Sequence, residues 1–170
     1  MKIHLIDGTY ELFRSYFAIP PIAAPDGRVV GAVRGLLQTL WGLLRREQVT
    51  HVAVAFDHVL ESFRNGLFAS YKTSDGIPED LRVQFELAER ATSAMGIVVW
   101  PMVEYEADDA IATATNRWAD APEVDQIVIC SPDKDFTQLV KNDGVVCLDR
   151  RTNCTMNETG VWDKFGVAPE

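Results

Sequence analysis

The chain has 170 residues, 47% of them hydrophobic, and a formal net charge of −9. This size allows one substantial core, so we expect a single domain over residues 1–170. No long apolar run or signal-peptide pattern is present, which argues against a membrane span and favours a cytoplasmic protein. The acidic balance excludes binding to nucleic acid through a broad basic face, so contact with phosphates has to be local or supplied by a part outside this sequence.

Five short runs rich in Val and Ile are predicted to be strands: residues 3–6, 51–56, 97–100, 126–130 and 145–148. Apolar residues recur at helical spacing over 33–44 and 81–95, and again over 111–118. Gly96 stands at the C-terminal stop position of the second of these helices. Strands alternating with helices predict an α/β fold, with a mainly parallel sheet of about five strands and helices on both faces.

Three segments do not follow this alternation. Residues 19–28 are rich in Pro and turn residues and are predicted to form a surface loop. Residues 58–77 form a long connection, which in a compact domain is usually functional or disordered. After residue 150 we expect a turn, a short extended piece around 152–156 and a last helix near Val161.

Acidic residues gather where the predicted strands end. In a parallel sheet these ends meet at one crevice, which is where such folds bind ligands. Carboxylates collected there would repel one another unless cations lay among them, and hard divalent ions such as Mg²⁺ or Mn²⁺ prefer carboxylate and phosphate oxygens. The pattern therefore indicates metal-assisted phosphodiester chemistry. The residues concerned are Asp7, Asp57, Asp133 and Asp135, where strands end, and a further cluster, Glu106, Asp108 and Asp109, which opens a predicted helix.

Geometry constrains this hypothesis. In the middle of a helix, Glu106 and Asp108 would diverge by about 200°, so they can converge only if Glu106 lies at the helix start. An Asp that follows a strand is also a common helix cap or turn former, and Asp109 could stabilise a helix N-terminus through the dipole. Arg64 and Lys72 taken alone would be ordinary surface charges. The three histidines and three cysteines show no metal-ligand spacing.

Six motifs in order resemble the 5′-nuclease domain of bacterial DNA polymerase I and its flap-endonuclease relatives: LIDGTYELFRSYFA, VAVAFD, SFR followed by YK, YEADD, SPDKDFTQLV and KFGVAPE. The combination of YEADD with a following DKD is far more specific than either motif alone. The resemblance implies a PIN-like α/β fold that removes 5′ nucleotides or flaps from DNA, using one or two Mg²⁺ or Mn²⁺ ions in a two-metal-type hydrolysis.

Carried over by position, the resemblance makes the seven acidic residues the metal ligands. It also implies that residues 58–77 form a helical arch or clamp that steers the 5′ strand. Lys72 and Tyr71 match residues that position the scissile phosphate there, and Arg64 matches the arginine at the start of the arch.

The sequence also departs from the family. Asp75 replaces a common Arg, and Phe17 replaces a common His. Relatives continue beyond the KFGVAPE position into a GD-xx-DN motif and a helix-three-turn-helix module that grips duplex DNA, neither of which lies in these residues. Two alternatives to a DNA nuclease therefore stay open. One is a PIN-type ribonuclease acting on RNA, and the other is a catalytically weak paralogue that binds nucleic acid.

Overall fold

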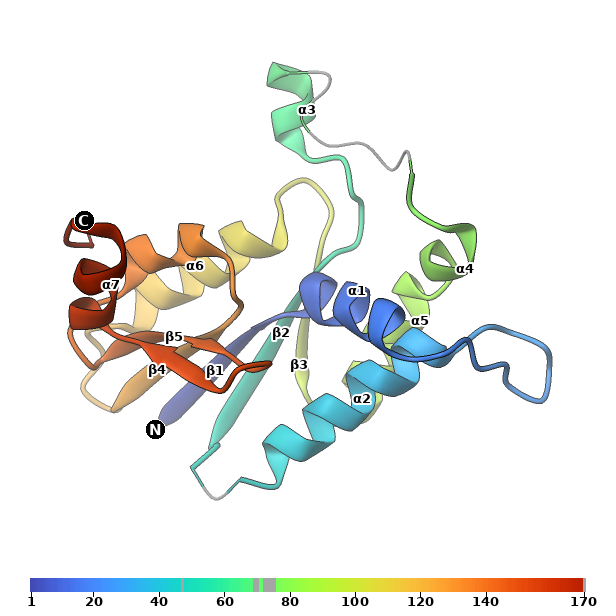
Figure 1. The fold of residues 1–170 in the computed structure, drawn as a ribbon, viewed down its shortest axis with the longest axis horizontal. Helices are drawn as coiled ribbons and strands as arrows, with labels where there is room; N and C mark the ends of the chain where they lie inside the picture. Colours follow the sequence, from blue (N-terminus) through green and yellow to red (C-terminus); the bar gives the residue numbers. More distant parts are fainter. Residues whose placement is uncertain (47, 69–70, 72–75, 170) are drawn as a thin grey trace.

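A computed structural model describes residues 1–46, 48–68, 71 and 76–169, and it is organised around one six-stranded sheet (Figure 1). The strand order is β3-β2-β1-β4-β5-β6, with β1 to β5 parallel and β6 antiparallel to β5. All five predicted strands are confirmed, and the sixth lies in the segment predicted to be extended. The strands are β1 (Lys2–Asp7), β2 (His51–Asp57), β3 (Val98–Met102), β4 (Gln126–Cys130), β5 (Val145–Asp149) and β6 (Cys154–Met156).

Helices cover both faces of the sheet, as predicted, because alternate strand residues point to opposite faces. Ile6 belongs to a core with α1 (Gly8–Ala18), α2 (Gly31–Leu44), α4 (Glu79–Arg82) and α5 (Phe85–Ala94). Its neighbour Leu5 belongs to a second core with α6 (Ala107–Trp118), α7 (Glu158–Phe165) and the 3-10 helix η1 (Lys134–Leu139). None of the described helices is long and apolar enough to cross a membrane.

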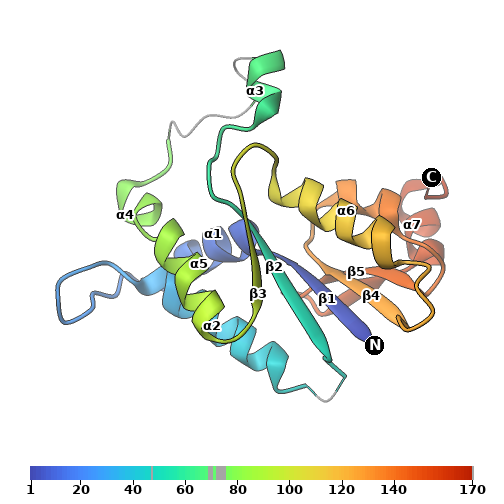
Figure 2. The same cartoon turned by 180° about the vertical axis from the view of Figure 1, so that it is seen from behind.

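The connection predicted over residues 58–77 contains a short helix, α3 (Phe63–Leu67), which projects beyond the sheet (Figure 2). Residues 69–70 and 72–75 lie outside the described residues, so Lys72 and Asp75 are not placed. The segment 19–28 is a loop, as predicted, and it is closed by an isolated bridge between Ala23 and Val29.

Helix α1 was not predicted. It begins directly after β1, where Asp7 caps it by accepting a hydrogen bond from the Tyr10 N–H. Gly8 permits this abrupt change of direction, because a Cβ there would lie 2.6 Å from side-chain atoms of Phe56 and Val54. In the sequence, Asp-Gly directly after a strand is typical of a turn. The residues that approach Gly8 closely belong to β2, which lies far along the chain.

The helix predicted over 81–95 is divided into α4 and α5, because the chain turns at Val83 and Gln84. Gln84 is completely buried. Its Oε1 accepts hydrogen bonds from the N–H groups of Ala32 and Val33 at 3.0 and 3.2 Å, while its Nε2 donates to the Asp80 carbonyl at 2.6 Å. It thus caps α2, whose own N-cap residue supplies no side-chain bond. The predicted end at Gly96 is confirmed by its left-handed φ of 80°.

We expect Gln84→Met to lower the free energy of unfolding by about 2 kcal/mol or more, because two buried N–H groups at the start of α2 lose their acceptor. Chemical denaturation in urea measures this change. Gln38→Met is the matched control, since Gln38 is exposed on α2. Equal stability of the two variants would contradict the capping role of Gln84.

Candidate active site

Two buried carboxylates lie at the carboxyl ends of the adjacent strands β1 and β2. Asp7 is 9% exposed and Asp57 is 4% exposed. Asp7 Oδ1 accepts from the Tyr10 N–H at 2.8 Å, and Asp57 Oδ1 accepts from the Ala107 N–H at 2.7 Å. Each carboxylate thus binds the start of a different helix, α1 or α6. The helix-capping interpretation and the shared-crevice interpretation therefore both hold for Asp7.

Asp7 and Asp57 share one open pocket of about 450 Å³ with two further carboxylates. Asp108 of α6 is half-buried, and Asp133, which follows β4, is exposed. We call the buried pair Asp7 and Asp57 the floor of the pocket, and Asp108 and Asp133 its rim. Its lining consists of Asp7, Thr9, Tyr10, Phe13, Asp57, Asp108, Ser131, Pro132 and Asp133.

Thr9 and Ser131 support the floor of the pocket. Thr9 Oγ1 accepts from the Asp57 N–H at 2.8 Å, and Ser131 Oγ donates to Asp7 Oδ2 at 3.2 Å. Ser131 Oγ also accepts from the Asp133 N–H at 3.3 Å, so it links floor and rim. The sequence analysis missed both hydroxyl residues. The available signal was their position, two residues after Asp7 and two before Asp133, in the same strand-end segments.

The electrostatics of the pocket are those of crowded acids. Burial, together with the negative charges of Asp108 and Asp57, raises the pKa of Asp7 to about 7, against the lowering effect of the hydrogen bonds from Tyr10 and Ser131. A cation in the pocket would reverse this balance by stabilising the ionised form. All four acidic side chains offer oxygen atoms, the donors that hard divalent ions take. The donor chemistry of these residues therefore fits such an ion.

At the start of α6, Glu106 is the N-cap residue, with an extended backbone at φ −99° and ψ 166°. It thus meets the condition that the sequence geometry imposed. Its side chain, however, is held by other groups: Oε1 accepts from Ser62 Oγ at 2.5 Å and lies 3.2 Å from Arg64 Nη1. Ser62 was a further residue that the sequence analysis missed.

Asp109 is held in the same way. The Arg64 guanidinium binds both of its oxygens, with Nη1–Oδ2 at 2.8 Å and Nη2–Oδ1 at 2.7 Å. This contact holds the pKa of Asp109 below its usual range. Asp109 lines a different pocket from the one formed by Asp7 and Asp57, on the side of α6 that carries Trp118.

The structure therefore sorts the seven predicted acidic residues. It brings together Asp7, Asp57, Asp108 and Asp133, whereas Glu106 and Asp109 are engaged by Arg64. Asp135 is exposed, and its N–H donates to Asp133 Oδ1 at 2.9 Å. Among the described residues, no three His, Cys, Asp or Glu side chains already lie close enough to hold one metal ion. The assignment of metal ligands stays a prediction.

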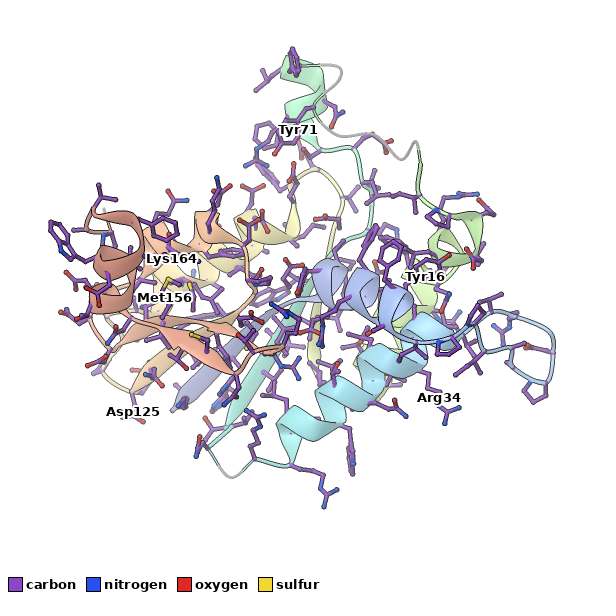
Figure 3. All side chains as sticks on the ribbon, viewed as in Figure 1. Tyr16, Arg34, Tyr71, Asp125, Met156 and Lys164 are labelled. Atoms are coloured by element: carbon purple, nitrogen blue, oxygen red, sulfur yellow. The ribbon has the colours of Figure 1, made fainter. Side chains whose placement is uncertain are left out.

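The three residues predicted to act on the phosphate belong to the connection after β2. Arg64 lies on α3, half-buried against α6, and Tyr71 is exposed beside α3 (Figure 3). Lys72 is outside the described residues. The roles of all three at the phosphate remain predictions.

A mainly parallel α/β sheet with acidic residues at the carboxyl ends of its central strands is typical of a PIN-like domain. Residues 2–166 match the family described as the 5′-3′ exonuclease, N-terminal resolvase-like domain. The chain belongs to this family. It is 38% identical over 170 residues to DNA polymerase I of Pseudomonas aeruginosa, covering 98% of this chain and 18% of that protein. It is 30% identical over 169 residues to a 5′-3′ exonuclease of Aquifex aeolicus, covering 99% of this chain and 57% of that protein.

Solved structures of phage T5 proteins share the fold. The T5 D15 protein co-crystallised with metal ions aligns with a TM-score of 0.73 at 15% identity, covering 98% of this chain and 62% of that chain. A variant of the T5 D15 flap endonuclease in a pseudo-enzyme-product complex with DNA and metal ions aligns with a TM-score of 0.72 at 17% identity, covering 98% and 61%. The predicted PIN-like 5′-nuclease fold is thereby confirmed. The present chain spans less than two thirds of each of these relatives.

We expect the contribution of Asp7 to the stability of the metal-free protein to fall as the pH rises from about 4 to about 7. The folded protein holds a proton on Asp7 in this range, whereas an unfolded Asp has released it. Asp7→Asn removes the charge and keeps an acceptor for the Tyr10 N–H. The variant should therefore be more stable than the wild type by roughly 2–4 kcal/mol at about pH 8, and by much less near pH 4.

Urea denaturation with a chelator at both pH values measures this difference. Asp163→Asn is the control, because Asp163 is exposed on α7 and does not line the pocket. If Asp7→Asn were no more stable than the wild type at the higher pH, Asp7 would not carry the unfavourable charge of the pocket.

Proposed function

We propose that this chain is a divalent-metal-dependent 5′-3′ nuclease domain that hydrolyses DNA phosphodiesters. The observation that carries the proposal is the pocket in which Asp7, Asp57, Asp108 and Asp133 meet, in a chain of the 5′-3′ exonuclease family. We further propose Mg²⁺ or Mn²⁺ as one or two cofactor ions, DNA with a free 5′ end or a 5′ flap as substrate, and the cytoplasm as location. Relatives named DNA polymerase I and T5 structures with DNA and metal ions support this assignment.

Asp7, Asp57, Asp108 and Asp133 are the residues best placed to hold the metal. Glu106, Asp109 and Asp135 remain further predicted ligands, each of which would have to turn toward the pocket. When bound, a divalent ion polarises the phosphate and lowers the pKa of water. The binding demands a rearrangement of side chains, to which the exposed Asp133 and the half-buried Asp108 contribute most readily.

The residues of the pocket floor hold their carboxylates in fixed orientations, and their negative charge disfavours a phosphate that arrives without a cation. Backbone N–H groups fix the carboxylates of Asp7 and Asp57, so these side chains face the pocket with little freedom. Without a cation, four carboxylates repel a phosphate, which is the physical reason to expect that metal and substrate bind together. The net charge of −9 acts in the same direction, so DNA contacts outside the pocket must be local. Tyr71 and Lys72 are the residues we propose for them.

Cleavage assays with substituted rim residues test the proposal. Asp108→Asn and Asp133→Asn should each lower the cleavage rate of a labelled 5′-flap DNA by about a hundredfold or more in Mg²⁺ and in Mn²⁺, because each removes an anionic oxygen ligand. Asp163→Asn on the exposed face of α7 is the control. Matched single-stranded DNA and RNA belong in the same experiment.

The substrates separate the alternatives. Preferential cleavage of RNA would replace the DNA nuclease by a PIN-type ribonuclease. Metal binding without cleavage of any substrate would indicate a catalytically weak paralogue, in which the acidic pocket is a structural site. Full activity of both rim variants would overturn the assigned metal centre.

Lys72→Ala should weaken binding of DNA and reduce the slope of log Kd against log salt concentration by about 1, because one phosphate contact is lost. Fluorescence anisotropy with a labelled flap substrate in Ca²⁺, over a salt series, measures both quantities. Lys141→Ala provides the control, since Lys141 is exposed and paired with Asp120 at 2.6 Å. An unchanged slope would remove Lys72 from the phosphate contacts.

A further inference from the structure

The base of the segment that follows β2 is bound to the start of α6 by a group of side-chain and backbone contacts. Arg64 binds both oxygens of Asp109, and Ser62 Oγ donates to Glu106 at 2.5 Å. The Phe63 N–H donates to the Glu104 carbonyl at 2.8 Å. We call the contacts of Ser62 and Arg64 with Glu106 and Asp109 the latch.

The latch is one step away from the acidic pocket. Asp109 Oδ2 also accepts from the Glu106 N–H at 2.9 Å, which completes a capping box at the start of α6. The residues between these two positions act on the pocket: the Ala107 N–H binds Asp57 at 2.7 Å, and Asp108 lines the pocket. A displacement of this helix turn would therefore move the Asp108 carboxylate and break the hydrogen bond from the Ala107 N–H to Asp57.

Arg64 is poorly placed to serve a phosphate at the same time. Its guanidinium makes a forked, charge-assisted contact with Asp109, the strongest kind of side-chain pair. It also lies 4.8 Å above the Phe63 ring, which in turn contacts the Tyr105 ring at 5.3 Å. Contact with a phosphate would require these interactions to be given up. The geometry favours a role inside the protein.

We propose that Arg64 is a positioning residue: by holding Asp109 and Glu106 it couples the segment after β2 to the turn of α6 that sets Asp57 and Asp108 in the pocket. The proposal rests on the proposed nuclease function, which it deepens. It predicts that removing either partner of the Arg64–Asp109 pair has the same effect on the reaction, because both substitutions open one contact.

Four variants test this coupling: Arg64→Gln, Asp109→Asn, their combination, and Arg64→Lys. The amide of the Asp109→Asn variant retains an acceptor for the Glu106 N–H, so this substitution keeps the capping box and removes the charge that Arg64 binds. Lysine keeps the positive charge but cannot bind both Asp109 oxygens through two parallel N–H groups. The Arg64→Lys variant should therefore retain more activity than Arg64→Gln. Arg82→Gln is the matched control, because Arg82 makes a forked contact with Glu79 on the exposed surface of α4.

The expected result on flap DNA in Mg²⁺ is a loss in kcat of about tenfold or more for Arg64→Gln and for Asp109→Asn, with KM for the DNA changed by less than about threefold. The double variant should be no worse than either single variant, and the urea midpoint of each should stay close to that of the wild type. The salt dependence of DNA binding should be unchanged. Arg64→Lys should fall between the wild type and Arg64→Gln.

A phosphate-contacting Arg64 would give the opposite pattern and overturn the proposal. Asp109→Asn would then keep kcat within about twofold of the wild type, Arg64→Gln would flatten the salt dependence by about one unit of slope, and the losses would multiply in the double variant. An Arg82→Gln variant that matched the loss in Arg64→Gln would likewise overturn it.

Hydrogen exchange on the protein without metal or DNA separates failure of this inference from failure of the nuclease function. The Phe63 amide should lose protection in Arg64→Gln and in Asp109→Asn and keep it in Arg82→Gln, whether or not the wild type cleaves any substrate. Unchanged protection at Phe63 in both latch variants would refute the coupling even if the protein proves to be a nuclease.

Discussion

The parallel pairing of β1 with both β2 and β4 is the constraint on which the rest of the structure depends. It brings three chain exits to one edge of the sheet, where Asp7 and Asp57 are buried as charged or protonated groups that need hydrogen-bond donors. The donors available there are the free N–H groups of helices that begin at the same edge. The starts of α1 and α6 are therefore fixed by the acids of the pocket as much as the acids are fixed by the helices.

Without a bound cation, this arrangement of acidic residues lowers the stability of the folded protein. Because the pKa of Asp7 is about 7, its ionisation lowers the stability of the folded protein. The two hydrophobic cores on either face of the sheet compensate for that loss. Such local conflict between stability and charge is typical of functional sites, because a group tuned for a bound ligand is poorly solvated without it. A divalent cation would convert the same repulsion into binding energy.

Sequence patterns predicted the sheet well because buried parallel strands are short runs of β-branched residues, as in Ile127–Ile129, and helical patterns lie between them. They also identified every acidic residue that lines the pocket, since Asp7, Asp57 and Asp133 follow strands and Asp108 belongs to the acidic run at the start of α6. They could not show which of the acids share the pocket, because Arg64, 45 positions before Asp109, engages Asp109 only when its side chain reaches the start of α6. The same reason hid Gln84, whose partners at the start of α2 lie 51 and 52 positions away.

The pocket unites two kinds of carboxylate, and their difference bears on how it would take a metal. Asp7 and Asp57 are buried and bound by backbone N–H groups, so the place of their oxygens is set by the sheet. Asp133 is exposed on a chain exit, where its Oδ1 accepts from the Asp135 N–H, and Asp108 lies on the first turn of α6 and is half-buried. The buried pair thus fixes where positive charge is favoured, whereas the outer pair determines how many oxygens reach it. Because the latch holds the turn that carries Asp108, a change in the contacts of the segment after β2 would also change how Asp108 could reach a bound ion.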